Sequence, residues 1–404
     1  MNKPTKKRVE RKAQESSFIL PESGRRTNAA RPKAQANGRL ESLDALRGFD
    51  MFFICGGSAL LVAIANLFPD SHVWQAIADN MEHVPWDGLR HHDTIFPLFL
   101  FIAGVSFPFS LERQREKGTS TPRIFLRIVR RGLTLVFLGL LYNGLLDFHW
   151  DTLRFCSVLS RIGLAWMFGA IIYTAVKDVR LVVAIVAVLL VGYWICNILL
   201  IAPGAPVGAD PLSKEWNIGC YIDRTILGAH CYRPEYDPEG LFSTLPAIGT
   251  ALLGMLTGRF VRRDDADISP RRKALCMFLA GIGFALLGWA WGVVYPINKA
   301  LWSSSFVCAV AGYSLIMFAL FYFIIDVLKW RGWDFFFVVI GMNSITIYLA
   351  QRFALFEGIS HKLFDGTVRL FAEPYGSVVE IVGYIAVWWL FLLFLYKKKV
   401  FLKV

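Results

Sequence analysis

The sequence is short of charged residues. Asp, Glu, Lys and Arg make up 18% of its 404 residues, whereas a soluble globular domain contains about 25%. Hydrophobic residues reach 55% and include 33 Phe and 13 Trp. The charge deficit is concentrated in stretches of roughly twenty residues, the length that crosses a bilayer. This composition excludes soluble enzymes, disordered proteins, collagens and disulfide-rich scaffolds.

Several other patterns are missing. No apolar segment near the start is followed by a small-residue cleavage site, so a cleaved signal peptide is not expected. The chain has no Asn-x-Ser/Thr acceptor, which favours a bacterial inner membrane over a glycosylated compartment. Residues 1–43 hold eleven basic residues against four Glu, without the amphipathic pattern of a nucleic-acid-binding surface. We therefore predict a disordered basic cytoplasmic tail over residues 1–38, a membrane domain over residues 39–404, and no nucleic-acid partner.

Ten apolar stretches have the length of a transmembrane helix. They lie at residues 44–68, 93–111, 127–146, 158–176, 180–201, 241–260, 273–294, 301–326, 333–355 and 378–396. The first and fourth are less apolar than the rest because they contain Asp44, Arg47, Asp50 and Arg161. The pattern predicts an all-α, polytopic integral membrane protein with about ten transmembrane helices.

The distribution of basic residues predicts the orientation, because Lys and Arg are retained on the cytoplasmic side. With the N-terminus inside, the inner segments hold 32 of the 43 basic residues, the outer loops hold 8, and 3 lie within spans. Both termini are therefore predicted inside. The longest loops, 69–92, 202–240 and 356–377, then face outward, which favours an extracytoplasmic substrate. Cys220 and Cys231 share one of these loops, and the sequence leaves open whether they pair.

Titratable residues gather where one outer loop enters the second span. Pro85 prevents a continuous helix between His83 and Asp93, so His83 belongs to an irregular loop. An imidazole there can serve as base or nucleophile near neutral pH, with Asp93 as the carboxylate that orients it. From composition alone, the plainer interpretation is a surface histidine and a helix-entry carboxylate. His91 and His92 do not form a metal site with Asp93, because consecutive residues of a helix point in different directions.

Ionisable and polar residues within spans are the other candidates. Arg47 lies near the inner end of the first span and can pair with Asp44 on the same helix face. Together with three arginines of the third span, it is a candidate for binding phosphates; the alternative is ordinary positive charge at the inner surface. Arg161 enters the membrane from the outer side, where topology does not explain a cation. The ninth span carries a polar patch that either serves function or joins helices. The third-span arginines are Arg127, Arg130 and Arg131, and the patch comprises Asn343, Ser344, Thr346 and Tyr348.

Six sequence blocks, in order, resemble the heparan-α-glucosaminide N-acetyltransferase family and its bacterial relatives. They are RLESLDALRGFDMF at 39–52, H-x-x-W-D-G-L-x-x-x-D-x-x-F-P from His83 to Pro97, GCYIDRTILG at 219–228, YDPEGLFSTLPAI at 236–248, PINKALWS at 296–303 and GMNSITIY at 341–348. The resemblance covers about residues 39 to 404. It implies transfer of acetyl from cytoplasmic acetyl-CoA, across the membrane, to the amine of a terminal glucosamine.

The resemblance also implies roles for individual residues. His83 takes the catalytic position and Asp93 the carboxylate beside it, and His83 either deprotonates the sugar ammonium or carries the acetyl group. Asn343 matches the family's ninth-span Asn, which can donate to an oxyanion. Further substrate contacts are expected from the outer segments, including stacking of Trp302 on a sugar ring. The CoA is expected to enter from the cytoplasm. The remaining substrate-binding candidates are Trp86, Arg161, Asn298 and Lys299, and the CoA-binding candidates are Arg47, Arg127, Arg130 and Arg131.

Where the family's animal members have an Asn before the glycines of the first span, this chain has Cys55-Gly56-Gly57. Its 69–82 stretch is longer, and the large luminal domain of those members is absent. A free aminosugar or a cell-wall glycan fragment is therefore expected as acceptor in place of heparan. The alternatives are a permease for aminosugars or N-acetylglucosamine, although the repeats typical of transporters are not seen, and O-acetylation of a surface polysaccharide. No metal is expected, lipid surrounds the chain, and whether it forms a homodimer stays open.

Overall fold

The structure, a computed structural model, describes residues 40–263 and 268–402. The basic tail predicted over residues 1–38 lies outside these residues. Within them the regular elements are helices, and strand-type pairing is limited to an isolated bridge between Ile201 and Asn217. The all-α prediction is confirmed for the part of the chain that the structure describes.

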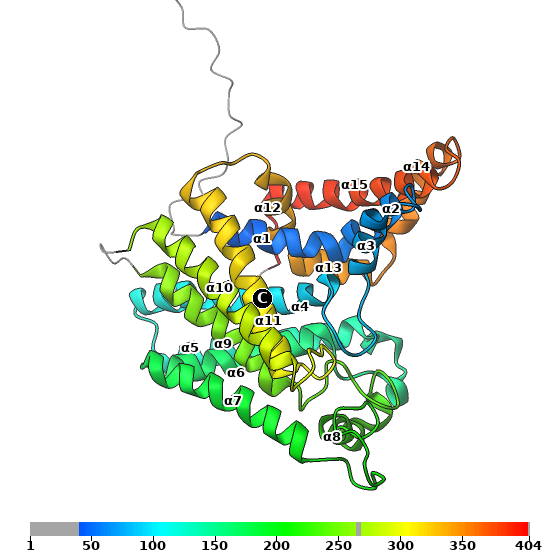
Figure 1. Ribbon diagram of the computed structural model, residues 1–404. Helices are drawn as coiled ribbons and strands as arrows, with labels where there is room; N and C mark the ends of the chain where they lie inside the picture. Colours follow the sequence, from blue (N-terminus) through cyan, green and yellow to red (C-terminus); the bar gives the residue numbers. More distant parts are fainter. Residues whose placement is uncertain (1–39, 264–267, 403–404) are drawn as a thin grey trace, which may run out of the picture. The chain divides into compact units, whose positions relative to one another are not determined.

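The first half of the chain forms long helices joined by short helical turns. These are α1 (Glu41–Phe52), η2 (Phe53–Gly57), α2 (Ser58–Ala65), α3 (His72–Asn80), α4 (His91–Glu116), α5 (Thr121–Tyr142), η3 (Leu145–Asp147), η4 (Trp150–Thr152), α6 (Val158–Ala175) and α7 (Val179–Leu199). In Figure 1, α1, η2 and α2 follow one another as one bent rod in blue, and α4 in cyan runs through the middle of the helices.

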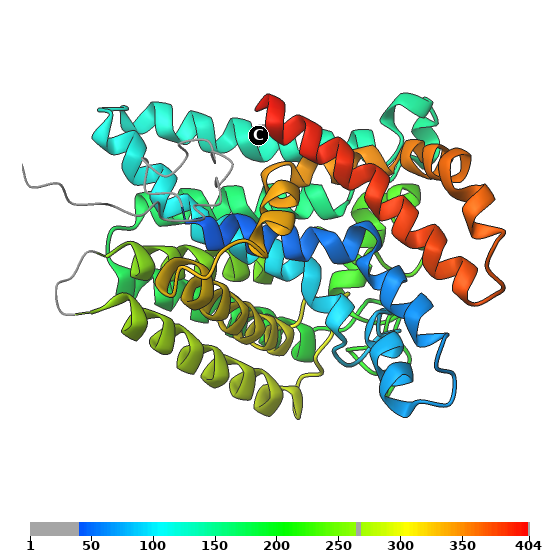
Figure 2. The same ribbon diagram turned by 90° about the horizontal axis from the view of Figure 1, so that it is seen from above.

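The second half begins with an outer-loop helix and continues into another set of long helices. These are α8 (Ile218–Leu227), η5 (Gly228–His230), α9 (Thr244–Arg262), α10 (Pro270–Gly292), α11 (Ser304–Phe321), η6 (Tyr322–Val327), α12 (Asp334–Met342), α13 (Ser344–Gln351), α14 (Leu355–Val368) and α15 (Tyr375–Lys398). Figures 1 and 2 both show α14 beside the start of α15, against which it packs. The segment 356–377, predicted as an outer loop, therefore contains a helix of its own.

Among the described residues, eight helical segments are long and apolar enough to cross a membrane. A ninth candidate is the pair α12 and α13, which meet at Asn343 with a bend of 71°. The eight are Glu41–Ala65, His91–Glu116, Val158–Ala175, Val179–Leu199, Thr244–Arg262, Pro270–Gly292, Ser304–Val327 and Tyr375–Lys398. A polytopic membrane protein is confirmed, while the count of ten and the orientation with both termini inside stay predictions.

The predicted third span corresponds to α5, which is 22 residues long but carries four arginines. The C-terminal half of α5 is apolar. Along the whole helix, three apolar side chains point away from the protein, Leu126, Leu133 and Phe137, with exposed fractions of 68%, 54% and 52%. Apolar side chains repeated along the outer face of a helix are typical of contact with lipid. Packing of α5 along α6 supports its assignment to the membrane domain.

Helix α4 is the most buried of the eight apolar segments, with 72% of its most apolar stretch inside the protein. It packs on α9 at glycines: a Cβ added to Gly254 would lie 2.2 Å from the carbonyl oxygen of Phe101, and one added to Gly104 would lie 2.4 Å from that of Ala251. Small residues let helix backbones approach this closely in membranes. The close contact fixes α4, whose first turn carries Asp93.

A bulky residue at Gly254 should therefore separate α4 from α9. We expect Gly254→Ile to lower the melting temperature of the purified protein in detergent, with a loss of about 1–3 kcal/mol or more because the clash is with backbone. Gly283→Ile on α10 is the matched control, since no heavy atom lies within 4 Å of a Cβ added there. Tryptophan fluorescence on heating measures both, and equal melting temperatures would contradict the proposed packing constraint.

Candidate active site

His83 and Asp93 meet at the N-terminal end of α4. His83 lies in the irregular segment between α3 and α4, and its Nδ1 is 2.8 Å from Oδ1 of Asp93. The histidine side chain is 54% exposed, while the carboxylate is 2% exposed. The structure thus brings together the two residues that the sequence singled out, with an accessible imidazole resting on a buried carboxylate.

Backbone groups hold the carboxylate of Asp93. Its Oδ2 accepts hydrogen bonds from the N–H groups of Val84 and Arg90, each at 3.3 Å. Asp93 occupies the third position of α4, where a carboxylate is also favoured by the positive end of the helix. With Oδ2 occupied by the backbone, Oδ1 is left to orient His83.

Lys299 is the third charged residue at this point. Its Nζ lies 3.0 Å from Nδ1 of His83, 3.4 Å from Nε2, and 3.4 Å from Oδ1 of Asp93. Burial lowers the pKa of the Lys299 amine, and the Asp93 carboxylate opposes that shift. The lysine and the carboxylate both approach Nδ1, so together they control which ring nitrogen of His83 carries a proton.

A tight turn presents Lys299, and Asn298 shapes it. The Asn298 Oδ1 accepts from the N–H of Leu301 at 2.9 Å, and its own N–H donates to Oγ of Ser303 at 3.0 Å. Asn298 is 1% exposed. The amide predicted to contact a sugar is instead a buried support for the lysine.

Trp302 does not offer a face to a sugar. Its side chain is fully buried, its indole Nε1 donates to Oγ1 of Thr250 at 3.2 Å, and its ring meets Phe96 edge-on. The prediction of sugar stacking by Trp302 is wrong in this structure, because the turn folds the ring into the core, where its large apolar surface is removed from water.

Arg161 lies behind the site and does not reach its surface. It is 1% exposed, with its guanidinium carbon 4.9 Å from the centre of the Trp302 ring. Its Nη2 donates to the carbonyl of Gly240 at 2.9 Å and to Oγ of Ser243, whereas Nε and Nη1 have no hydrogen-bond partner among the described residues. In this structure Arg161 packs against the ring of Trp302, in place of the predicted contact with substrate.

Trp86 joins two outer segments. Its Nε1 donates to the carbonyl of Leu212 at 3.1 Å, its ring meets Tyr236 edge-on, and Nζ of Lys214 lies 5.2 Å from the ring centre. The ring is half-buried. Trp86 therefore anchors the loop of His83 to the connection between α7 and α9, beside the site.

His92 is a neighbour that the sequence reading missed. Its ring centre is 4.4 Å from that of His83, and its Nδ1 is 3.1 Å from Oγ of Ser58. The sequence pattern excludes it only as a metal ligand, although its place next to Asp93 in the sequence is a usable signal. The described residues contain no group of three or more His, Cys, Asp or Glu side chains that could hold a metal ion.

A small cavity lies deeper, at the break between α12 and α13. Its volume is about 20 Å³, room for about one water molecule. Asn343 sits at the break, 2% exposed, and neither its Nδ2 nor its Oδ1 has a partner among the described residues. Phe96 and Phe99 of α4, Ile162 of α6 and Ser344 of α13 are among the lining residues.

The four predicted CoA-binding arginines separate into two groups. Arg47 donates to Oγ of Ser106 at 3.2 Å, and Arg131 lies with its guanidinium 4.2 Å from the ring centre of Trp166. Nε of Arg131 is buried without a partner in the described chain. Arg127 and Arg130 are exposed on α5, and Arg127 donates to Gln114 at 2.9 Å.

Comparison with known proteins shows the family to which this chain belongs. A family profile described as "Heparan-alpha-glucosaminide N-acetyltransferase, catalytic" matches residues 39–288, more than half of the chain. The chain belongs to this family. It is 27% identical over 417 residues to the heparan-alpha-glucosaminide N-acetyltransferase of Homo sapiens, and 27% identical over 423 residues to that of Mus musculus.

These alignments cover 91% and 92% of this chain but 60% and 62% of the two relatives. The chain thus spans about three fifths of the length of the curated relatives it matches. The resemblance seen in the sequence is confirmed. The region matched by the heparan-alpha-glucosaminide N-acetyltransferase profile includes His83, Asp93 and Arg161, whereas Lys299 and Asn343 follow it.

Two sequence blocks of this family member take part in a charged layer in the connection between α7 and α9 and the start of α9. Arg154 binds Asp237 in a two-point contact, with distances of 2.6 and 3.0 Å, and also binds Glu239. Asp223 of α8 accepts from the N–H groups of Leu241 and Phe242 at 2.8 and 3.3 Å. Asp223, Asp237 and Glu239 stand in the blocks at 219–228 and 236–248, but the sequence pattern alone assigns them no role. Through Gly240 and Ser243 the layer reaches Arg161.

The outer-loop cysteines are not paired. Cys220 and Cys231 are both free thiols, and Sγ of Cys231 lies 3.6 Å from the carbonyl oxygen of Asp223. Burial raises the pKa of the Cys220 thiol to about 12 and that of Cys231 to about 11. Hydrogen bonds and ion pairs hold this layer in the structure.

The layer should make stability depend on pH through Asp223. Burial raises the pKa of Asp223 from 3.8 to about 6, so the folded state binds this proton more tightly than the unfolded state. Stability from this group is therefore present at low pH and is lost as pH rises through 6, by up to about 3 kcal/mol.

Asp223→Asn keeps an oxygen that accepts from both N–H groups and removes the charge. We expect the variant to melt at a higher temperature than the wild type at pH 7.5 and at the same temperature near pH 3, below the unfolded-state pKa of 3.8, as measured by tryptophan fluorescence in detergent. A difference that is the same at both pH values would contradict this origin.

Proposed function

We propose that the chain is an acetyl-CoA-dependent N-acetyltransferase that transfers acetyl to the amine of a glucosamine-type sugar on the extracytoplasmic side of a bacterial inner membrane. The observation that carries this proposal is the exposed His83 imidazole on the buried carboxylate of Asp93, at the outer mouth of α4. The names of the relatives supply the reaction class, and the count of basic residues supplies the sidedness.

One face of α4 supports a route for the donor. His92, Phe96, Phe99, Ala103 and Ser106 follow at spacings of three and four, so they lie on one stripe of the helix. At its outer end the stripe meets His83, in its middle it lines the cavity, and at its inner end it meets Arg47. Phe96 and Ser106 are about 15 Å apart along the axis, a length that an extended pantetheine arm spans.

The fit to acetyl-CoA rests on polar groups placed along this stripe. Arg47 and the unpaired Nε of Arg131 are suited to the CoA phosphates, because a guanidinium binds phosphate through several donors. The amide of Asn343, buried without a partner among the described residues, is suited to the thioester carbonyl. Acetyl-CoA supplies the activated acetyl group, and Arg127 and Arg130 are not part of this proposal.

His83 acts as the base for the acceptor. It takes a proton from the sugar ammonium at its accessible ring nitrogen, while Asp93 holds the ring and stabilises its positive charge. The neutral amine then forms the C–N bond as the C–S bond to CoA breaks. The electron pair leaves with the sulfur, and the thiolate takes up the second proton, which the new amide nitrogen loses. Lys299 lies 3.0 Å from Nδ1 of the same imidazole.

The acceptor is a free aminosugar or the end of a cell-wall glycan. Trp86, three residues after His83 in the sequence, and Lys214 over its ring offer an aromatic side chain and a cation for a sugar, while Trp302 and Asn298 are buried and take no part. Acetyl transfer to nitrogen follows from the named activity of the relatives.

Removing the imidazole should abolish transfer. We expect His83→Ala to lower the rate of CoA thiol release from acetyl-CoA and glucosamine by about 10²–10⁴-fold, with N-acetylglucosamine measured in parallel. His72→Ala, an exposed histidine on α3, is the control that should keep the wild-type rate. Equal rates for His83→Ala and the wild type would refute the assignment of His83.

The donor site has a separate test. We expect Arg47→Gln and Arg131→Gln each to raise the KM for acetyl-CoA about tenfold or more, since each removes a charge-assisted contact to phosphate. Arg130→Gln, on the exposed face of α5, should leave KM unchanged. If the two variants melt earlier but bind acetyl-CoA normally, the arginines are structural and the proposed phosphate site is wrong.

A further inference from the structure

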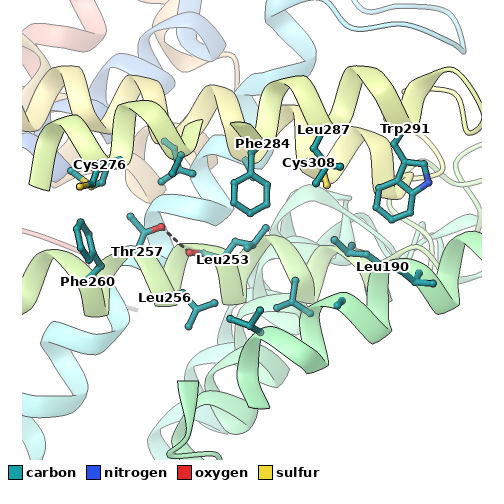
Figure 3. Close-up of a pocket in the computed structure, with 18 residues that line it drawn as sticks. Leu190, Leu253, Leu256, Thr257, Phe260, Cys276, Phe284, Leu287, Trp291 and Cys308 are labelled. Carbon is teal, nitrogen blue, oxygen red and sulfur yellow. Dashed lines mark hydrogen bonds between the residues drawn. The ribbon is translucent and has the colours of Figure 1, made fainter. Parts of the chain in front are cut away.

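An apolar groove lies between α7 and α10, on a floor made by α9 and α11 (Figure 3). Its volume is about 520 Å³. The floor residues are buried within the protein, with Cys308, Ala311 and Leu315 at most 5% exposed. Because all four helices are membrane-spanning segments, the groove opens to the hydrocarbon of the bilayer and not to water.

The two ends of the groove differ. At the end nearer Lys299, α7 and α10 meet through Trp194 and Trp291, whose ring centres are 5.5 Å apart edge to face. The groove ends on the other side at Phe260 and Cys276, which Figure 3 shows at its opposite end. From Cys276 to Trp291 it is about 22 Å long, at 1.5 Å per residue. An occupant therefore enters from the Cys276 end.

That open end points toward arginines on all three adjoining helices. The lining stripe of α10 passes through residues 276, 280, 284, 287 and 291, and one turn before it stands Arg272. The lining residues of α7 begin at Val183, three positions after Arg180, and those of α9 end at Phe260, three positions before Arg263. The three arginines are exposed. Helical spacing places Arg180 and Arg272 on the edges of the open end, and Arg263 directly follows the last residue of α9.

The dimensions decide between a lipid chain and a protein helix. A helix about 10 Å across and 22 Å long occupies roughly 1,700 Å³, more than three times the volume of the groove. An extended acyl chain is far thinner and fits the length. Arginines at the mouth of a groove between membrane helices favour an anionic headgroup.

We propose that this groove is a binding site for an anionic phospholipid. One acyl chain lies along α10 and ends against Trp194 and Trp291, and the phosphate lies among Arg180, Arg263 and Arg272. The lipid comes from the leaflet on the arginine side. At the end of the floor nearer Lys299, Ser304 donates a hydrogen bond of 2.6 Å to the carbonyl of Leu190. This end of the floor continues into the turn that carries Lys299, so the bound chain supports that turn. The proposal of a lipid site rests on the groove and the arginines alone and not on the proposed acetyl transfer.

Native mass spectrometry of the full-length protein in detergent tests the site, with palmitoyl-oleoyl phosphatidylglycerol and phosphatidylcholine added in equal amounts. We expect the wild type to retain phosphatidylglycerol preferentially. Ala280→Phe fills the groove and should reduce retention roughly tenfold or more, because its ring takes the place of buried methylene groups. Leu279→Phe, on the neighbouring exposed face of α10, is the matched control and should retain lipid as the wild type does.

The headgroup and the identity of the occupant have their own readouts. Arg180→Gln combined with Arg272→Gln should bring retention of the two lipids close to equal, whereas an unchanged preference overturns the headgroup site. Equal retention by Ala280→Phe and Leu279→Phe, at matching melting temperatures, overturns the groove as the chain site. A disulfide-linked dimer that forms on oxidation and disappears in Cys276→Ser would show that a second copy fills the groove, and would also overturn the proposal.

Discussion

The carboxylate of Asp93 is the point on which the site depends. It stands in the first turn of the most buried transmembrane helix, and it binds two backbone N–H groups, the imidazole of His83 and the amine of Lys299. A buried carboxylate without such partners would be strongly unfavourable. The outer loop and the turn at 296–303 therefore have to fold onto the end of α4, and by satisfying Asp93 they deliver a histidine and a lysine to the same place.

The rigidity of that point comes from the membrane interior. Between helices in a bilayer there is little hydrophobic driving force, so close backbone contact and buried polar groups set the packing. Gly104 and Gly254 let α4 lie directly on α9, while Arg161 under Trp302 connects the charged outer layer to the turn of Lys299. Arg161 leaves two donors without partners in the described chain, which indicates that the position of this turn is maintained at an energetic cost.

Much of this could be predicted from the sequence, and the remainder shows what limits such a prediction. Charge-poor stretches and Pro85 predict the helices and the loop of His83, because they act through local chemistry. The burial of Asn298 and Trp302 could not be predicted, since a short turn between two spans can lie on the surface or fold inward. Whether the side chains of this turn face inward depends on residues distant in sequence, such as Thr250. The spacing of residues within the turn does not reveal these partners.

The arginines of α5 illustrate a limit of a different kind. Arg130 and Arg131 are neighbours in sequence, but on a helix they point about 100° apart, so one face cannot carry both. The contact with α6 decides which of the two arginines faces inward, and the guanidinium of Arg131 packs over the ring of Trp166. The same geometry extends along α4, whose single stripe passes from Ser106 to His92. This continuous face belongs to the helix whose N-terminal end holds His83 against Asp93.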